Sequence, residues 1–505
     1  MPSPSPTRDS RPPGDARIVT VRSAFRSLRR MRIEVLGGLV VALALIPEAI
    51  SFSIIAGVDP RVGLFASFTM AVTIAVVGGR PAMISAATGA VALVVAPIAR
   101  EYGMDHLVAT VLLAGVLQIV LSVLGVAKLM RFIPRSVMVG FVNALAILIF
   151  VAQLPHLFGV PWLVYPLVAV GIGIIVGLPR LTRVVPAPLV AIIVLSIAVV
   201  ALGVDVPNVG DQGELPESLP MLFLPQVPLT LETLRIIGPY AFAMALVGLL
   251  ESLMTAKLVD DITDSHSDKT REAWGQGVAN IVTGAFGGMG GCAMIGQTMI
   301  NVKSSGARTR ISTFLAGTFL LVLVVLLGDV VAVIPMAALV AVMVMVSVGT
   351  FDWHSIRPRT LRQMPLSATL IMVVTVVATV ATSNLAIGVG LGVVVAMVLF
   401  ARRVAHFTEV VDVAHPDDDT RVYAVRGVLF FASSNDLVYQ FDYVGDPQNV
   451  IIDLSDAQIF DASTVAALDA IEVKYHEKGK NVSIVGLNEP SAKWHRLSGK
   501  LGAGH

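Results

Sequence analysis

The chain has 505 residues, of which 55% are hydrophobic and only 14% are charged, and its formal net charge at pH 7 is +1. Soluble proteins average about 25% charged residues, so this composition excludes an ordinary soluble protein and indicates many lipid-spanning segments. The near-neutral charge gives no sign of a nucleic-acid partner, and the single cysteine, Cys292, excludes disulfides and cysteine-based metal sites.

The N-terminal residues, 1–30, are rich in Pro, Ser and Arg and lack the apolar core of a signal peptide, so we expect a disordered cytoplasmic tail. From 31 to 404 apolar runs follow one another with short polar breaks, which predicts a membrane domain, at about 20 residues for each span. The fourteen predicted spans are 33–56, 62–79, 83–99, 107–127, 136–154, 162–178, 187–204, 233–257, 273–286, 291–301, 311–328, 333–350, 366–383 and 385–403.

Loop charges support this number of spans, because cytoplasmic loops of membrane proteins are enriched in Lys and Arg. With the Arg-rich N-terminus inside, fifteen basic residues fall in the inner loops and three in the outer loops. The inner residues are Arg80, Lys128, Arg131, Arg135, Arg180, Arg183, Lys257, Lys269, Arg271, Lys303, Arg308, Arg310, Arg357, Arg359 and Arg362, and the outer ones are Arg61, Arg100 and Arg235. An even number of spans places both termini in the cytoplasm.

The composition changes after the last span. Residues 405–420 are predicted to be a polar linker, and 421–505 a small cytoplasmic α/β domain. In that domain, strand-like runs (VYAVRGVLFF, NVIIDLSDA and NVSIVGL) alternate with a helical pattern from Ala462 to Lys478.

Two carboxylates interrupt the apolar pattern. Glu48 and Glu251 are each the only charge in the middle of a predicted span, and ionisable groups at that depth are costly and usually functional. Phe52 and Thr255 each lie four residues further along, on the same helix face as the carboxylate. One interpretation is a pair of carboxylates that bind a coupled proton or cation in a cavity. The other is a structural carboxylate that caps a helix or pairs with a buried polar group.

Two segments are too short and too rich in small residues for ordinary spans: RPAMISAATGAV, around Ser85–Gly89, and GMGGCAMIGQTMIN, at Gly288–Asn301. They are the third and the tenth segments, hence the third in each of two seven-span halves, and interrupted segments at matching positions indicate a binding site. Two half-helices that meet in mid-membrane would direct their N-terminal N–H groups and positive dipole ends at one pocket, which suits an anion. Alternatively, the small residues only allow close helix packing.

These same stretches resemble the sulfate permease family, also called solute carrier family 26. The run ALIPEAISFSIIAGVDPRVGLFASF is similar to the family's first-span signature, and ALVGLLESLMTAKLVDDIT is similar to its eighth span. REAWGQGVANIVTGAFGGMGGCAMIGQTMINVKSSGARTRIS is similar to its most characteristic stretch. The C-terminal domain resembles a STAS domain (sulfate transporter and anti-sigma factor antagonist).

The resemblance implies an all-α domain of fourteen spans in two inverted seven-span repeats, the uracil-permease fold with a core and a gate, followed by the STAS domain, in a homodimer. It also implies transport of a small anion through a site between spans 1, 3, 8 and 10. Carried over by position, the substrate-binding residues are Glu48, Phe52, Ser85, Ala86, Ala87, Thr88, Ala293, Met294, Ile295, Gly296 and Gln297. The ion-coupling residues are Glu48, Glu251 and Thr255, the last two matching the cation site of a sodium-coupled bicarbonate member.

Two departures from the family pattern bear on the substrate. Glu48 stands where the family usually has Gln, and Gln297 stands where many members have Arg, so the site is less positive. This favours an anion brought in with protons, such as a carboxylate or dicarboxylate symported with H⁺ by an alternating-access, elevator-type mechanism. The alternatives are a sulfate or bicarbonate transporter coupled to H⁺ or Na⁺, or a passive anion channel of the same fold.

The sequence predicts a multi-pass protein of the cytoplasmic membrane that is no enzyme and needs no cofactor or metal. The membrane portion contains no histidine pair, cysteine cluster or Ser/His/Asp set, and no Walker motif is present. In the STAS-like domain, Asp461-Ala462-Ser463 occupies the Asp-Ser-Ser position of the anti-sigma antagonists, which makes Ser463 a candidate regulatory phosphorylation site. The simpler interpretation is that Ser463 caps a helix at a strand–helix turn.

Overall fold

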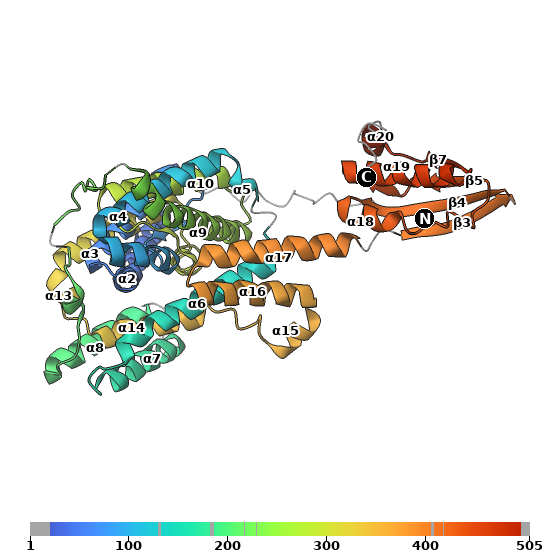
Figure 1. The fold of residues 1–505 in the computed structure, drawn as a ribbon. Helices are drawn as coiled ribbons and strands as arrows, with labels where there is room; N and C mark the ends of the chain where they lie inside the picture. Colours follow the sequence, from blue (N-terminus) through green and yellow to red (C-terminus); the bar gives the residue numbers. More distant parts are fainter. Residues whose placement is uncertain are drawn as a thin grey trace, which may run out of the picture. The chain divides into compact units, whose positions relative to one another are not determined.

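A computed structural model of the chain describes residues 21–129, 133–181, 186–216, 218–228, 230–405, 409–417 and 419–495. The chain divides into two compact units, with the boundary after Gly392, inside helix α17 (Leu385–Ala405). Figure 1 shows the helices of the first unit and the sheet of the second.

One group of helices in the first unit surrounds the two short segments singled out above. Its long helices are α2 (Leu28–Ala56), α3 (Pro60–Val77), α4 (Gly89–Val123), α9 (Leu231–Thr263), α10 (Lys269–Ala285) and α12 (Arg310–Leu326). Helix α4 packs against α9 and α10 (Figure 1), and α12 packs against α2 and α3. The short helices are α1 (Val21–Phe25), α5 (Val126–Leu129) and α11 (Ile295–Met299), which continues into a π turn at Ile300–Ser304.

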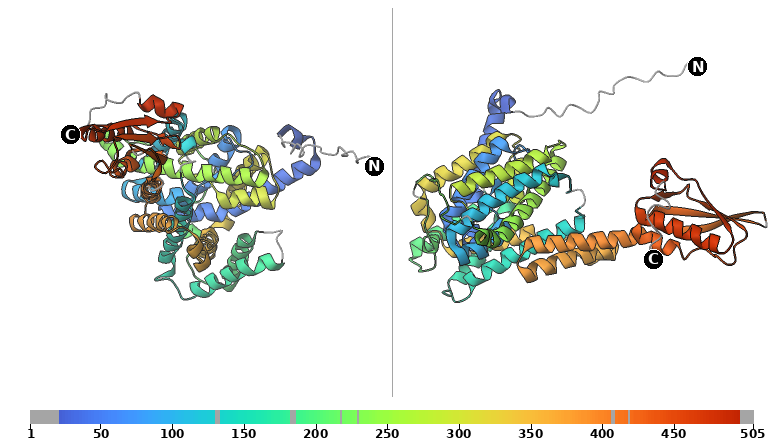
Figure 2. Two further views of the ribbon diagram at one scale, coloured as in Figure 1. Left: turned by 90° about the vertical axis from the view of Figure 1, so that its right-hand side faces the viewer. Right: turned by 45° about the horizontal axis from the view of Figure 1, so that its top comes forward.

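The second group consists of α6 (Arg135–Gln153), α7 (Val164–Leu181), α8 (Ala187–Leu202), α14 (Met336–Thr350), α16 (Leu366–Thr382) and the first part of α17. Helix α6 packs against α14 and α16, and α7 packs against α8 and α14 (Figure 1). Figure 2 shows the helices of the first unit from two further directions. The connections contain short helices at Leu154–Leu157, Val209–Gln212, Gly328–Ala332 (α13) and Pro358–Gln363 (α15). Glycines allow close packing here, since a Cβ on Gly140 or Gly392 would overlap Thr375.

Seven helices of the described residues are long and apolar enough to cross a membrane, and four shorter ones are also apolar. Every predicted span corresponds to a helical segment, with two differences. The third and fourth spans are joined in α4, which is kinked at Gly103, a residue with a φ of 79°. The third and tenth spans each begin with extended backbone. Fourteen membrane crossings stay a prediction.

Loops predicted on the same side contact one another. At one end, the Arg30 side chain donates to the Gly306 carbonyl, and Glu34 accepts from the Arg308 N–H. At the other end, Asp59 accepts from the Glu214 N–H. The contacts agree with the alternation inferred from the loop charges, whereas the end that faces the cytoplasm stays a prediction.

Two predicted boundaries are wrong in part. The expected disordered tail contains α1 and the start of α2, which Ser27 caps by accepting from the Arg30 N–H; residues 1–20 lie outside the described residues, as do Arg131 and Arg183. The expected linker contains strand β3 (Glu409–Asp417), because its polar run pairs with the next strand as a sheet edge.

The second unit is a five-stranded sheet with helices, as the alternating pattern predicted. Strands β3, β4 (Thr420–Leu429), β5 (Asn449–Asp453) and β7 (Asn481–Val485) lie in this order, and β6 (Ala457–Ile459) also pairs with β4. The β3–β4 pair is antiparallel and the other pairs are parallel. The helices are α18 (Phe431–Leu437), α19 (Ala462–Glu477) and α20 (Glu489–His495). Val465, Leu468, Ile471 and Tyr475 of α19 are buried in its core.

The two short segments of the first unit pair with each other. Strand β1 (Ser85–Ala86) and strand β2 (Cys292–Ala293) are antiparallel, with Ser85 opposite Ala293 and Ala86 opposite Cys292. The Met294 N–H extends the pairing by donating to the Ile84 carbonyl at 2.8 Å. Gly291 lies so close to Ala86 that a Cβ would overlap the Ala86 carbonyl oxygen.

We predict that Gly291→Ala lowers the melting temperature of the detergent-purified protein, because backbone atoms cannot move aside as a side chain can. Overpacking of this kind costs about 1–3 kcal/mol. Gly173→Ala in α7 is the matched control, since a Cβ there meets no atom within 4 Å. Equal melting temperatures of the two variants would contradict the close approach of β1 and β2.

Candidate functional site

A helix begins directly after each of the paired strands. Thr88 is the N-cap of α4 and accepts from the Val91 N–H at 3.3 Å, whereas Met294 precedes α11 without a side-chain cap. The first N–H groups of a helix have no intrahelical partner, and they carry the positive end of the helix dipole. The β1–β2 pair therefore brings two helix N-termini to one place.

A row of polar side chains on α10 holds this arrangement. Asn280 accepts from the Gly291 N–H (2.9 Å) and donates to the Gly291 carbonyl (3.1 Å), next to β2. One turn earlier, Gln276 donates to the Ser85 hydroxyl of β1 at 2.7 Å. Another turn earlier, Glu272 accepts from two N–H groups of the loop before β1. Residues at a spacing of four share one helix face, so one face of α10 anchors both broken segments.

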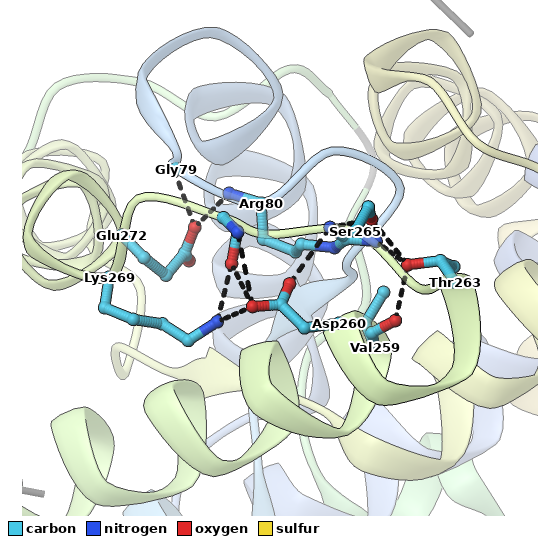
Figure 3. Close-up of polar contacts among 9 residues, drawn as sticks. Gly79, Arg80, Val259, Asp260, Thr263, Ser265, Lys269 and Glu272 are labelled. Atoms are coloured by element: carbon cyan, nitrogen blue, oxygen red, sulfur yellow. Dashed lines mark hydrogen bonds and ion pairs between the residues drawn. The ribbon is translucent and has the colours of Figure 1, made fainter. Parts of the chain in front are cut away.

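Ion pairs and hydrogen bonds connect the loop before β1, which contains Gly79 and Arg80, to the end of α9 (Figure 3). Arg80, whose guanidinium lies 3.0 Å from Asp260, also donates to Ser265 and Thr263. Lys269 bonds the other oxygen of Asp260. Burial lowers the pKa of Arg80, and the Asp260 carboxylate opposes this shift, so the arginine depends on its partner.

A cavity of about 110 Å³ lies at the two helix N-termini. This volume is large enough for a small solute. Its lining from the first helix group is Glu48, Phe52, Thr88, Gly89, Glu251, Met294, Ile295 and Gly296. Helices α6 and α14 of the second group close the opposite wall with Phe141, Val142, Leu145, Ile149, Val346 and Thr350.

Seven of the predicted site residues line this cavity: Glu48, Phe52, Thr88, Glu251, Met294, Ile295 and Gly296. Four others, Ser85, Ala86, Ala87 and Ala293, are buried behind it in or beside the β1–β2 pair, where they build the site without facing it. The Thr255 hydroxyl donates to the Glu251 carbonyl at 2.7 Å. Gln297 bonds the Glu48 side chain, and its Oε1 has no hydrogen-bond partner in the described part of the chain.

The cavity has an unusual charge balance for an anion site. Glu48 from α2 and Glu251 from α9 both line it, whereas no Lys, Arg or His is among its lining residues in the part of the chain that the structure describes. Glu251 is only 7% exposed and accepts from the Cys292 thiol at 2.9 Å. An anion bound there would meet two carboxyl groups and two positive helix ends.

A larger hollow of about 720 Å³ lies at the end of the unit that holds Asp59 and Arg61. Glu214, also in its lining, forms an ion pair with Arg61, so these two charges neutralise each other. This hollow contains none of the predicted site residues.

Sequence reasoning missed Gly89 and the wall contributed by α6 and α14. Phe141, Val142, Leu145, Ile149 and Val346 are apolar residues in apolar helices, so no sequence signal separates them from lipid-facing neighbours. Cys292 was also missed, because a lone cysteine in the sequence forms no disulfide or metal cluster and gives no other signal of a role.

The cap of α19 differs from the prediction. Asp461 is the N-cap and accepts from the Thr464 N–H at 3.0 Å, whereas Ser463 is an exposed residue of the first turn. The prediction that Ser463 caps the helix is wrong, because Asp461, two residues earlier, has the extended backbone that a cap requires. The regulatory role of Ser463 stays a prediction.

We expect Asn280→Ala to destabilise the protein, since it leaves the Gly291 N–H and the Gln118 Oε1 without their partner. Each unsatisfied buried group costs about 1–3 kcal/mol, which a fall in the melting temperature should report. Thr270→Ala, at an exposed position of the same helix, is the control. An Asn280→Ala protein as stable as this control would rule out the anchoring role.

We further expect Asp461→Ala to weaken α19 by about 1 kcal/mol, the usual contribution of a cap, and Ser463→Ala to leave it unchanged. Hydrogen–deuterium exchange of peptides from 462–477 in the full-length protein measures this. Faster exchange in the Ser463 variant than in the Asp461 variant would assign the cap to the serine instead.

Comparisons with known proteins agree with this architecture. The sulfate permease family model matches residues 31–170 and 174–375, and the STAS domain model matches 411–501. A putative sulfate transporter of Bacillus subtilis, YbaR, is 54% identical over 91% of this chain and 95% of its own length. The bicarbonate transporter BicA of Picosynechococcus is 26% identical over 93% of this chain and 90% of its own length.

Two solved structures share the fold. The transmembrane domain of a cyanobacterial BicA superposes with a TM-score of 0.64 at 25% identity, covering 74% of this chain and 98% of its own. The murine anion transporter Slc26a9 in its inward-facing state superposes with a TM-score of 0.80 at 16% identity, covering 93% of this chain and 87% of its own. The chain thus belongs to the sulfate permease family of anion transporters and carries a C-terminal STAS domain.

Proposed function

We propose that this chain is a secondary transporter that moves a small anion across the membrane together with protons. The observation behind the proposal is the cavity at the two helix N-termini. Glu48 and Glu251 line this cavity, and no basic side chain is among its lining residues in the described part of the protein. The helix ends supply backbone donors and partial positive charge for the anion. The carboxyl groups supply the proton-binding positions.

Electrostatics link the two ligands. Charges in a buried, low-dielectric site interact far more strongly than in water, so an anion beside two ionised carboxylates is strongly repelled. A proton on Glu48 or Glu251 removes one of these charges. Anion binding and proton binding therefore favour each other in such a cavity, which is the requirement for symport.

The chemistry of the walls supports an anion that is charged at one end and apolar at the other. Backbone donors lie on one side, whereas Phe52, Phe141, Leu145 and Ile149 form apolar surface. A small monocarboxylate has this character, and a dicarboxylate has it once one of its two carboxyl groups is protonated. The names of the relatives, a putative sulfate transporter and a bicarbonate transporter, support sulfate and bicarbonate as the other candidates.

The cavity lies between two helix groups that each pack extensively within themselves. We propose that the first group carries the bound anion past the wall formed by α6 and α14, in an elevator-type alternation of access. We also propose a homodimer in the cytoplasmic membrane with both termini in the cytoplasm, in keeping with the loop charges.

We predict that purified protein in proteoliposomes acidifies the lumen when an inward gradient of its anion is imposed. The probes are succinate, sulfate and bicarbonate, each with a pH dye inside the vesicles. Glu251→Gln and Glu48→Gln should each reduce or abolish the acidification, because a neutral amide cannot release a proton. Glu101→Gln, an exposed carboxylate outside the cavity, should transport like the wild type.

Transport of one probe without proton movement would contradict the proposed coupling. A current that follows the anion gradient and exceeds any carrier turnover would instead identify a channel. Anion uptake that depends on added Na⁺ and leaves the luminal pH unchanged would assign the carboxylates to a cation other than H⁺.

A further inference from the structure

A chain of three hydrogen bonds connects Glu251 to the N-terminus of α4. The Cys292 thiol donates to Glu251 Oε2 at 2.9 Å, and its sulfur lies 3.1 Å from the Thr88 hydroxyl. That hydroxyl accepts from the Val91 N–H. The three side chains are 0%, 2% and 7% exposed for Cys292, Thr88 and Glu251, so bulk water does not compete for these bonds.

Two of the three hydrogen-bonded side chains line the cavity, and the one between them does not. Thr88 and Glu251 are both lining residues, whereas Cys292 lies behind them in β2, opposite Ala86. The thiol is therefore placed to connect an anion-contacting hydroxyl with a proton-binding carboxyl group.

The number of hydrogen atoms on Glu251, Cys292 and Thr88 decides which of these groups donates in each hydrogen bond. A thiol has one hydrogen, a hydroxyl has one, and an ionised carboxylate has none. The two contacts of the sulfur then use both hydrogens: the thiol donates to Glu251 and the Thr88 hydroxyl donates to the sulfur. With Glu251 ionised, Thr88 has no hydrogen left for an anion in the cavity.

A proton on Glu251 adds a third hydrogen for the same two contacts. The carboxyl group can then donate to the sulfur and the thiol to the Thr88 oxygen, which still accepts from the Val91 N–H. The hydroxyl hydrogen of Thr88 becomes free to point into the cavity. The only new covalent bond is the O–H bond of Glu251, because the thiol and hydroxyl hydrogens keep their atoms and only change direction.

We propose that Cys292 is a positioning residue that converts proton binding at Glu251 into a hydrogen bond from Thr88 to the transported anion. The inference rests on the proposed proton-coupled transport, and it adds the route by which the proton raises anion affinity. Linkage makes the effect reciprocal, so anion binding at Thr88 also favours the protonated form of Glu251.

The other charged groups nearby do not compete for the hydrogen bonds among Glu251, Cys292 and Thr88. Glu48 of α2 is the second titratable group in the cavity lining, and α4, α6, α11 and α14 contribute only uncharged side chains there. Glu272 of α10, which packs against α4 and α9, is bonded to Gln276 and to the N–H groups of Gly79 and Arg80. Glu251 is thus the carboxyl group in contact with the thiol.

The test compares the KM for uptake at pH 5.5 and pH 7.5 in proteoliposomes, with whichever of succinate, sulfate and bicarbonate the wild type transports. Coupling between two sites commonly amounts to roughly tenfold in affinity, so we expect the wild-type KM to rise about that much at the higher pH. Cys292→Ala breaks these hydrogen bonds, so its KM should rise clearly less between the two pH values than the wild-type KM does. The rise that remains comes from the charges of Glu48 and Glu251 themselves. Cys292→Ser retains one hydrogen at that position and should restore the pH dependence.

Thr88 provides a second, independent pair. Thr88→Val removes the donor, so its KM at pH 5.5 should exceed that of the wild type and should rise less toward pH 7.5, whereas Thr88→Ser should retain the full shift. Thr110→Val is the matched control, a buried threonine of the same helix whose hydroxyl bonds the His106 carbonyl outside the cavity lining. If Cys292→Ala does not fold, the comparison of Thr88→Val with Thr88→Ser, together with Cys292→Ser, still tests the inference.

The outcomes separate the two proposals. A wild type that moves no protons with its anion overturns the proposed function and this inference together. A proton-coupled wild type whose pH dependence survives undiminished in both Cys292→Ala and Thr88→Val overturns this inference alone. A smaller pH dependence in both variants, with its full return in Cys292→Ser and Thr88→Ser, supports the inference.

Discussion

The whole site depends on the backbone pairing of two short segments deep within an apolar helix bundle. Irregular backbone in the hydrocarbon region must find polar partners inside the protein, since no water is there to supply them. Strands β1 and β2 satisfy part of this requirement for each other. The face of α10 with Glu272, Gln276 and Asn280 satisfies most of the rest. Two helix ends can therefore stop at mid-bundle without leaving their preceding loops unsatisfied.

This anchoring explains the most characteristic sequence stretch of the chain. Its polar residues recur at every fourth position, and the glycines between them let α10 approach α3 and α4 closely. A Cβ on Gly277 would press against the backbone of Gly115, and one on Gly275 against Gly78. The α10 part of the stretch is thus scaffold. The residues that line the cavity are Met294, Ile295 and Gly296, further along the same stretch, and residues of α2, α4, α6, α9 and α14.

The sequence predicted the parts of the site that differ chemically from their surroundings. Glu48 and Glu251 could be found because a charge in an apolar span is costly, and the broken segments because Gly and Ser interrupt apolar runs. The wall from α6 and α14 could not be found, since Leu145 or Ile149 looks the same whether it faces a cavity or lipid. The pairing of Ser85 with Ala293 also could not be read from sequence, because the backbone makes it. Strand β3 was missed because a charged edge strand resembles a linker.

The use of backbone atoms to join β1 and β2 has an evolutionary consequence. A bridge between main-chain groups tolerates many side chains, provided that they are small enough, as the crowding at Gly291 requires. The few residues that project from the helix ends can then be exchanged without rebuilding the frame beneath them. Selectivity can diverge rapidly among paralogues on such a frame while the architecture is inherited unchanged.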